Sequence, residues 1–164
     1  MCQNALCERN QGMLKRKKTA VWAILALLCL TSCKRREAVS AEVFNRTMEE
    51  QGYEIADATN QIQTEYVEAI SLAQKDGYQI EFYVFSDAKA AFSVFGQNKS
   101  LFEEYKGAGS FELSKDIGNY HFYSLTTNGM YYLLSQVDNT MCYVVADAEY
   151  KAEIADIIKL LGYE

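Results

Sequence analysis

The 164-residue sequence has no proline, one histidine and one tryptophan, and these shortages exclude several kinds of protein. Without proline there can be no proline-rich recognition segment. Because His121 is the only histidine, no site can use two imidazole groups, and the sequence has no CxxC pair and no cluster of Cys and His at zinc-ligand spacing. Glycine-rich phosphate-binding loops and the HExxH, EF-hand and GxSxG patterns are also absent. The sequence therefore predicts no cofactor, no metal and no recognisable catalytic motif.

The net charge argues against nucleic acid as a partner. Five of the 16 basic residues and one of the 22 acidic residues lie within residues 1–32. From Cys33 onward the chain therefore has 11 basic and 21 acidic residues, a net charge of about −10. Binding to phosphates needs a basic surface, which this composition does not supply. An acidic surface of this kind usually serves solubility.

The segment from Met13 to Cys33 has the three parts of an export signal in order. A basic block, Lys15–Lys18, precedes an uninterrupted apolar run over Ala20–Leu30. The run has 11 residues, which is too short for the roughly 20 residues of a membrane-spanning helix. Small residues then precede Cys33.

The tetrapeptide Leu30-Thr31-Ser32-Cys33 resembles the lipobox of bacterial membrane lipoproteins. The resemblance covers only Met13 to Cys33. It implies that a peptidase cuts between Ser32 and Cys33, and that the sulfur of Cys33 carries a diacylglyceryl group. The mature protein would then be anchored to the cell membrane by lipid and would face outside the cytoplasm. A short signal anchor, or an ordinary cleaved signal followed by a chance cysteine, is the alternative.

The resemblance divides the chain into a signal peptide over 1–32, a lipidated tether over 33–39 and an extracytoplasmic domain over 40–164. A translation start at Met13 would place the basic block at the N-terminus, where signal peptides have it, so we expect Met13 to be the true start. Cys142 lies in an apolar run, and we expect it to be a small buried hydrophobic residue rather than a reactive thiol.

The sequence predicts that the domain consists of strands separated by tight turns, together with three helices. Patterns of apolar residues predict strands over 53–59, 78–85, 120–125, 130–137 and 141–146. The apolar positions of 66–73 fit a helix or a strand, and the Asp76-Gly77 turn that follows favours a strand. Asp76-Gly77, Asn128-Gly129 and Asp138-Asn139 have the composition of hairpin turns. Residues 107–118 are read as a glycine-bearing connection.

Helices are predicted after Ser40, Asp87 and Asp147, each acting as an N-cap. The first helix ends at Gly52, and Gly96 is expected to interrupt the second before residues 101–105. The third has one apolar stripe, made of Tyr150, Ile154, Ile157, Ile158 and Leu161.

The resulting fold class is α+β, an antiparallel sheet of five or six strands with helices mainly on one face. Residues 82–88 and 141–148 both run from a strand through Asp-Ala into a helix. This pattern suggests a β-β-α repeat whose two helices cover the same face. Convergence on one type of strand-to-helix junction explains the pattern equally well.

All 12 tyrosines follow residue 52, and several crowd the strands after residue 119. Tyrosine in a strand normally packs its ring and leaves its hydroxyl in water, which describes a half-buried sheet. The functional alternative is an aromatic binding surface for an envelope protein or a glycan. The candidate residues for that surface are Tyr120, Tyr123, Tyr131 and Tyr132.

These observations favour a non-catalytic, lipid-anchored domain that binds or supports a component of the bacterial cell envelope. A small envelope enzyme that uses His121 is one alternative. That reading needs a carboxylate and a nucleophile beside the imidazole, which the neighbouring sequence does not supply. An inhibitor or accessory subunit of a membrane complex is the other alternative.

Overall fold

The computed structural model describes residues 35–62 and 64–164, which form one folded unit over Arg35–Glu164. The expected signal peptide, its cleavage point and Cys33 lie outside the described residues. Among the helices that are described, none has the length and apolar character that a membrane span requires.

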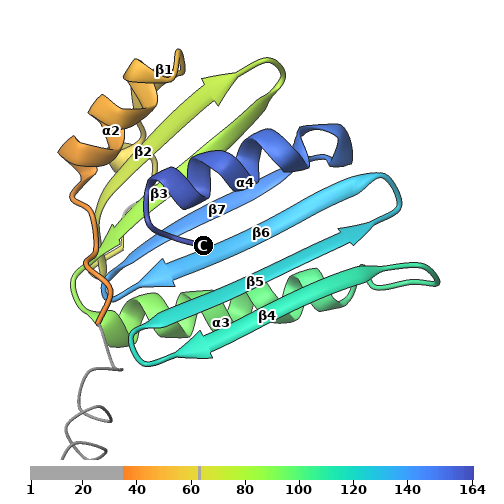
Figure 1. The fold of residues 1–164 in the computed structure, drawn as a ribbon. Helices are drawn as coiled ribbons and strands as arrows, with labels where there is room; N and C mark the ends of the chain where they lie inside the picture. The colour runs from red at the N-terminus through yellow and green to blue at the C-terminus, as the bar shows by residue number, and fades with distance from the viewer. Residues whose placement is uncertain (1–34, 63) are drawn as a thin grey trace, which may run out of the picture. The chain divides into compact units, whose positions relative to one another are not determined.

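The core of the fold is one seven-stranded antiparallel sheet, with the strand order β1-β2-β3-β7-β6-β5-β4 (Figure 1). The expectation of an antiparallel sheet in an α+β fold is confirmed, and the expected strand count of five or six is wrong. The strands are β1 (Glu54–Asp57), β2 (Val67–Lys75), β3 (Tyr78–Phe85), β4 (Phe111–Ile117), β5 (Tyr120–Thr127), β6 (Met130–Val137) and β7 (Thr140–Asp147).

The strand that the sequence analysis missed is β4, which occupies the region read as a glycine-bearing connection. Phe111, Leu113 and Ile117 do alternate with polar residues, but Lys115 interrupts the pattern and glycines stand on both sides. The strand lies at the edge of the sheet, and nearly all its side chains are exposed. An edge strand buries too little for its composition to differ clearly from that of a loop.

Tight turns set the register of the hairpins. Asp76-Gly77 and Asn128-Gly129 have positive φ at both residues, as a type I′ turn requires, and each joins two strands that pair directly. Asp138-Asn139 joins β6 to β7 in the same way, with φ +50° at Asp138. All three turns that the sequence predicted are therefore confirmed.

The helices are α2 (Ala41–Glu50), α3 (Ala88–Glu103) and α4 (Lys151–Leu160), with short 3-10 turns at Thr59–Gln61 and Ala148–Tyr150. Ser40 caps α2 by accepting a hydrogen bond from Val43 N at 3.2 Å, and Asp87 caps α3 by accepting one from Ala90 N at 2.8 Å. Both caps are confirmed. Gly96 does not interrupt α3, because the cost of about 1 kcal/mol for a glycine is smaller than the gain from burying two phenylalanines of the same helix.

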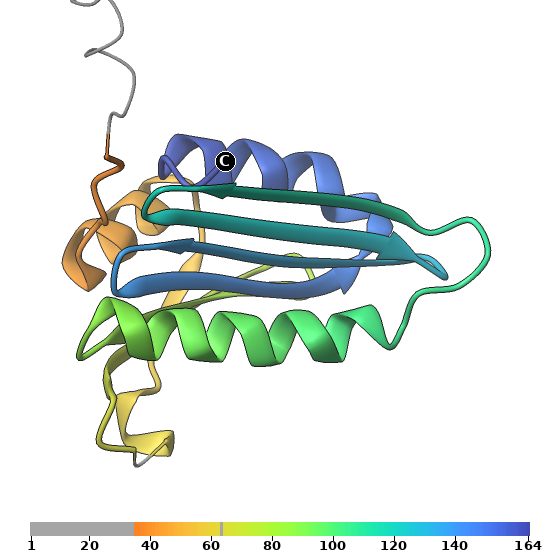
Figure 2. The same cartoon turned by 90° about the horizontal axis from the view of Figure 1, so that it is seen from below.

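The three helices are divided between the two faces of the sheet (Figures 1 and 2). Helices α2 and α4 cover one face, and their core includes Phe44, Ile158 and the strand residue Phe82. Helix α3 covers the other face, and its core includes Phe95, Phe102 and the strand residue Leu134. The expectation that the helices after Asp87 and Asp147 cover the same face is wrong.

A difference in the two junctions accompanies this arrangement. Asp87 caps α3 directly, whereas a 3-10 turn stands between Asp147 and α4. Asp147 makes no capping hydrogen bond, so the predicted cap is wrong. Strands β3 and β7 are antiparallel neighbours, so a two-fold axis that related them would be perpendicular to the sheet. Such an axis does not exchange the two faces, and it would therefore place both helices on the same face. The two β-β-α segments are therefore not related as a symmetrical repeat.

Residues 35–39, expected to belong to the tether, pack on the domain. Arg35 forms an ion pair of 2.7 Å with Asp138. The backbone of Arg36 exchanges two hydrogen bonds with the side chain of Asn119, at 3.1 and 2.8 Å, and its guanidinium donates to Gly162 O at 2.8 Å. These two basic residues therefore bind the domain itself.

Cys142 lies on β7 in the α2/α4 core and is completely buried. Burial raises the pKa of its thiol far above the usual value. It is the only free cysteine among the described residues, and its environment is that of a small hydrophobic residue.

Candidate functional site

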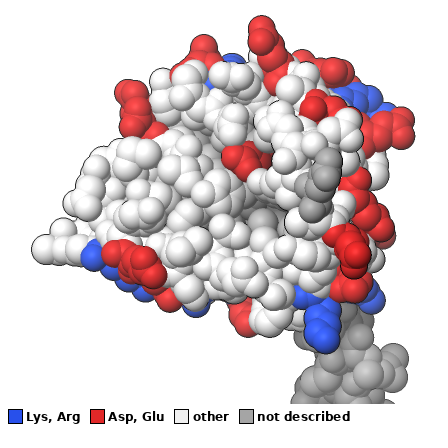
Figure 3. All heavy atoms as spheres, turned by 180° about the vertical axis from the view of Figure 1, so that it is seen from behind, with Lys and Arg blue, Asp and Glu red and all other residues white. Residues whose placement is uncertain are grey.

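A groove runs along α3 on the side of the sheet that this one helix covers. It consists of two adjoining cavities of about 400 and about 500 Å³, which share Glu81, Asn98 and Tyr143. Cavities of this size accept small molecules or single side chains. Figure 3 shows this face, on which acidic groups gather at the margins around a largely uncharged middle.

Three parts of the chain build the groove. Its floor is made by residues of β3 and β7 that alternate toward α3, with Glu81 directly opposite Tyr143 and Tyr83 opposite Met141. One wall is α3, from Val94 to the residues just after its end, and the other is the loop that leads into β2. The lining residues from that loop and the start of β2 are Ile62, Thr64, Tyr66 and Val67.

Of the described residues that line either cavity, Glu81 is the only charged one. Its half-buried carboxylate accepts a hydrogen bond from the hydroxyl of Tyr83 and one from Gln79 Nε2, the latter at 2.8 Å. Both donors are neutral, and none of the ion pairs between described residues includes Glu81. The carboxylate is thus held in place without a positive partner.

The tyrosine hydroxyls beside Glu81 stay protonated. Burial raises the pKa of Tyr83, and the hydrogen bond to Glu81 and the charge of that carboxylate raise it further. Burial also raises the pKa of Tyr143, with the charge of Glu81 as the next cause. The groove therefore presents neutral aromatic rings around one carboxylate.

The end of the groove near the C-terminus of α3 is strongly aromatic. The rings of Tyr105 and Tyr132 stack with centroids 5.3 Å apart and planes 11° apart. The ring of Phe102 lies 4.9 Å from that of Tyr132 and 5.4 Å from that of Tyr143. Leu101, which is 55% exposed, borders this end and leaves an apolar surface open to solvent.

A third, smaller cavity of about 250 Å³ lies between α3 and the edge strand β4, and His121 lines it. Nδ1 of His121 lies 3.0 Å from Oδ1 of Asp116, and its ring packs against Phe92 with centroids 4.7 Å apart. Strand β4 therefore supplies the carboxylate that the local sequence did not. Ser114 also lines this cavity, but among the described residues the only side chain paired with His121 is that of Asp116.

A nucleophilic site needs its hydroxyl within hydrogen-bond reach of the base, and the base held by a third group. The pair of His121 and Asp116 meets only the second condition, and Asp116 is 77% exposed along its side chain. Across residues 35–62 and 64–164, no three His, Cys, Asp or Glu side chains stand close enough to hold a metal ion. The larger groove is therefore the better candidate site.

The chain matches no protein-family model, no curated protein and no solved structure.

The four tyrosines proposed from the sequence as a binding surface are not brought together. Tyr120 and Tyr131 are buried in the α2/α4 core, and Tyr123 is buried in the α3 core. Only Tyr132 lines the groove. The buried three belong to the half-buried sheet that was the other interpretation of the tyrosine excess.

The residues that make the groove, Glu81, Tyr83, Tyr105 and Tyr143, were not proposed from the sequence. One signal for them was present. The alternation of β3 places Ile80 and Phe82 on one face, so Gln79, Glu81 and Tyr83 must lie on the other. A carboxylate in the middle of a central strand needs water or polar groups around it. Its presence therefore indicates that the helix on that face does not cover the strand completely.

Proposed function

We propose that this chain is a lipid-anchored, non-catalytic domain that faces outside the cytoplasm and binds a component of the bacterial cell envelope in the groove along α3. One observation carries the binding part of the proposal. It is the junction of two cavities over Glu81, Asn98 and Tyr143, where aromatic rings surround one carboxylate. Small-molecule sites typically combine apolar and aromatic walls with a few polar groups that orient the ligand.

The anchoring part rests on the residues from Met13 to Cys33, with their basic block, short apolar run and lipobox. Two acyl chains on Cys33 would hold the protein stably, whereas a single chain binds membrane only marginally. The net charge of about −10 from Cys33 onward would keep the domain off an anionic membrane surface. A domain held in this way leaves its groove open to the aqueous envelope.

Site-specific photo-crosslinking in native membranes tests the binding part. A photoreactive residue at position 101 borders the groove, and the same residue at position 160 is a matched control. Leu101 and Leu160 are similarly exposed, at 55% and 57%, but they lie on helices that cover opposite faces of the sheet. We expect an adduct from position 101 and none from position 160.

A second substitution shows whether the adduct depends on the groove. Asn98→Arg fills the junction of the two cavities and places a positive group near Glu81, so it should abolish the adduct at position 101. Equal adducts from positions 101 and 160, or an adduct that survives Asn98→Arg, would contradict a ligand site in the groove.

Mass spectrometry of the N-terminal peptide from the native membrane tests the anchor. The expected product begins at Cys33 and carries two or three acyl chains. Cys33→Ser should release or mislocalise the protein, because it removes the sulfur that would take the lipid. An intact, unlipidated segment through Cys33, or full membrane retention of the variant, would refute the lipoprotein assignment and leave the groove unaffected.

A further inference from the structure

We infer that the groove along α3 binds a small organic cation, an ammonium group carried on an apolar or aromatic body. This inference rests on the proposed function, since it names the ligand class of the same site. It is carried by the relationship between Glu81 and the rings around it.

Glu81 has no counter-charge among the described residues. A carboxylate withdrawn from water is normally paired with a cation or a metal. Glu81 is half-buried, and among the described residues its hydrogen bonds come only from the neutral side chains of Tyr83 and Gln79. A positively charged ligand would supply the charge that the described residues do not.

Aromatic rings lie beside that carboxylate. Tyr143 lies directly across from Glu81 on the neighbouring strand, and Tyr83 lies two residues further along β3. The face of an aromatic ring attracts a cation within about 6 Å of its centroid, most strongly where water is excluded. Rings and carboxylate thus favour the same kind of ligand.

A second acceptor lines the same two cavities as the carboxylate. The side-chain amide of Asn98 donates from Nδ2 to Val94 O at 2.9 Å, and its carbonyl oxygen receives no hydrogen bond from any described residue. Asn98 lines both cavities, as Glu81 does. An ammonium group between them would have two oxygen acceptors, one charged and one neutral.

The ligand is organic rather than a metal ion. Hard divalent cations need several oxygen ligands, and the described residues offer one carboxylate here and no cluster of three ligating side chains. The cavities of about 400 and 500 Å³ also have far more room than a bare ion needs. Apolar walls such as Leu101, Phe102 and Val145 suit a hydrocarbon or aromatic body.

The test is a titration of the full-length protein in detergent, followed by NMR, with phenethylamine and its neutral analogue phenethyl alcohol. The two probes differ chiefly in the ammonium group. We expect the amine to shift the signals of groove residues and to bind at least about tenfold more tightly than the alcohol. Benzyltrimethylammonium should bind to the same residues, because the aromatic rings and the carboxylate attract its positive charge.

Glu81→Gln is the decisive variant, since it keeps the shape and removes the charge. It should weaken binding of both cationic probes by about tenfold or more and leave that of the alcohol unchanged. Glu54→Gln, at an exposed glutamate on β1 outside the groove, is the matched control and should change neither. Thermal melting of both variants confirms that folding is retained.

Three results would overturn the inference. These are equal binding of amine and alcohol, amine binding that Glu81→Gln does not weaken, and no binding of either cation. A neutral disaccharide such as cellobiose could instead bind the groove equally well in the original protein and in the Glu81→Gln variant. The ligand class would then be a glycan and not a cation. That last outcome would leave the proposed function standing, because the crosslink from position 101 does not depend on ligand charge.

Discussion

The guanidinium of Arg36 lies over the ring of Tyr120, with its central carbon 3.6 Å from the ring centroid. The contact joins the start of the described chain to the first residue of β5. The same guanidinium donates to Gly162 O, so it also holds the C-terminal end of the domain. Residues 35–39 therefore belong to the fold, and they begin only two positions after the expected lipidation site.

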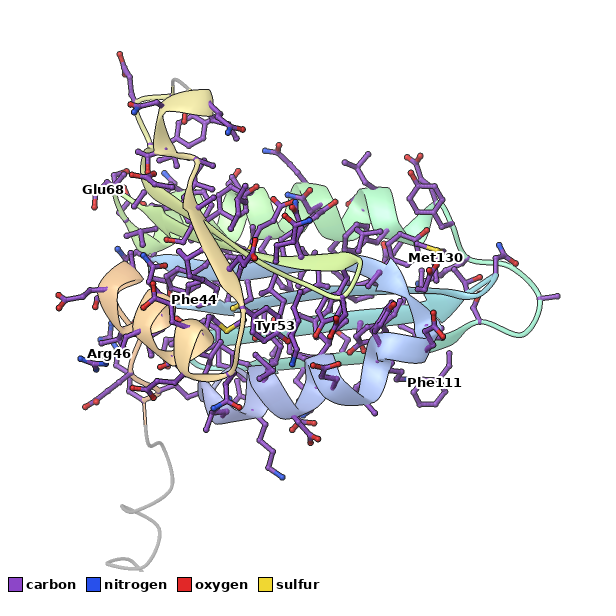
Figure 4. All side chains as sticks on the ribbon, turned by 90° about the horizontal axis from the view of Figure 1, so that it is seen from above. Phe44, Arg46, Tyr53, Glu68, Phe111 and Met130 are labelled. Atoms are coloured by element: carbon purple, nitrogen blue, oxygen red, sulfur yellow. The ribbon has the colours of Figure 1, made fainter. Side chains whose placement is uncertain are left out.

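Replacing Arg36 with alanine should destabilise the domain. The change removes a partly desolvated cation–π contact and a hydrogen bond to a backbone carbonyl, together worth about 1–2 kcal/mol. Arg46→Ala is the control, because Arg46 is exposed and points away from the domain, whereas Phe44 of the same helix is buried (Figure 4). Chemical denaturation measures both, and equal stability of the two variants would show that the contact has no energetic role.

Ile158→Asp should unfold the protein. Ile158 on α4 is completely buried against the sheet, and a carboxylate there has no partner. Such a change costs about 4 kcal/mol or more, a large part of the stability of a small domain. Leu160→Asp places the same charge two residues later on the same helix, at a side chain that is 57% exposed, and should shift stability by about 0.5 kcal/mol or less. Circular dichroism melting compares the two, and a normal melting temperature for Ile158→Asp would contradict the packing of α4.

The protein should lose stability at alkaline pH through its buried tyrosines. Burial raises the pKa of Tyr120 to about 12, although the charge of Arg36 acts in the other direction. In the unfolded chain tyrosine ionises near about pH 10, so above that pH the unfolded state binds fewer protons than the folded state. The stabilising contribution is therefore complete below about pH 10 and is lost as the pH rises through 10 toward 12.

Denaturation measured at several alkaline pH values, with tyrosinate absorbance as a second readout, checks this dependence. Tyr120→Phe should reduce the slope of stability against pH, because it removes one of the ionising groups. A slope that is unchanged in the variant would mean that Tyr120 does not contribute to the alkaline loss.

His121→Ala should leave any cellular phenotype of the protein intact. The imidazole has a carboxylate neighbour in Asp116, but it lies outside the groove along α3. We expect a loss of stability of about 1 kcal/mol from the contacts with Phe92 and Phe95, and no loss of function. Phenotype and melting temperature are measured together. A variant that folds normally and has lost the phenotype would favour the envelope enzyme instead.

Several elements were predictable because local chemistry determines them. Asp76-Gly77 and Asn128-Gly129 suit positive φ at two successive residues, and they brought the flanking strands into the expected pairs. Ser40 and Asp87 supply side-chain acceptors for the free N–H groups of a helix start. Failures occurred where local signals are weak, as at β4, or misleading, as at Gly96.

The groove is a different case. Glu81 and Tyr143 are 62 positions apart in the sequence and become direct neighbours only through the pairing of β3 with β7. Asn98 joins them because α3 lies on that face of the sheet. No single stretch of sequence contains this combination, so residue patterns alone pointed instead to the crowded tyrosines of β5 and β6.

The sequence by itself determined the strands of the central sheet, its turns and the helix starts at Ser40 and Asp87, because each depends on interactions between residues a few positions apart. It also provides the whole basis for proposing a lipid anchor on Cys33, since a targeting signal is recognised as a linear segment. The tertiary structure alone decided which face each helix covers and that Tyr120, Tyr123 and Tyr131 are buried. It also decided that Glu81 lies among aromatic rings and forms no ion pair with another described residue. These features depend on contacts between distant segments, which form only when the strands pair into the sheet and each helix packs on one of its two faces.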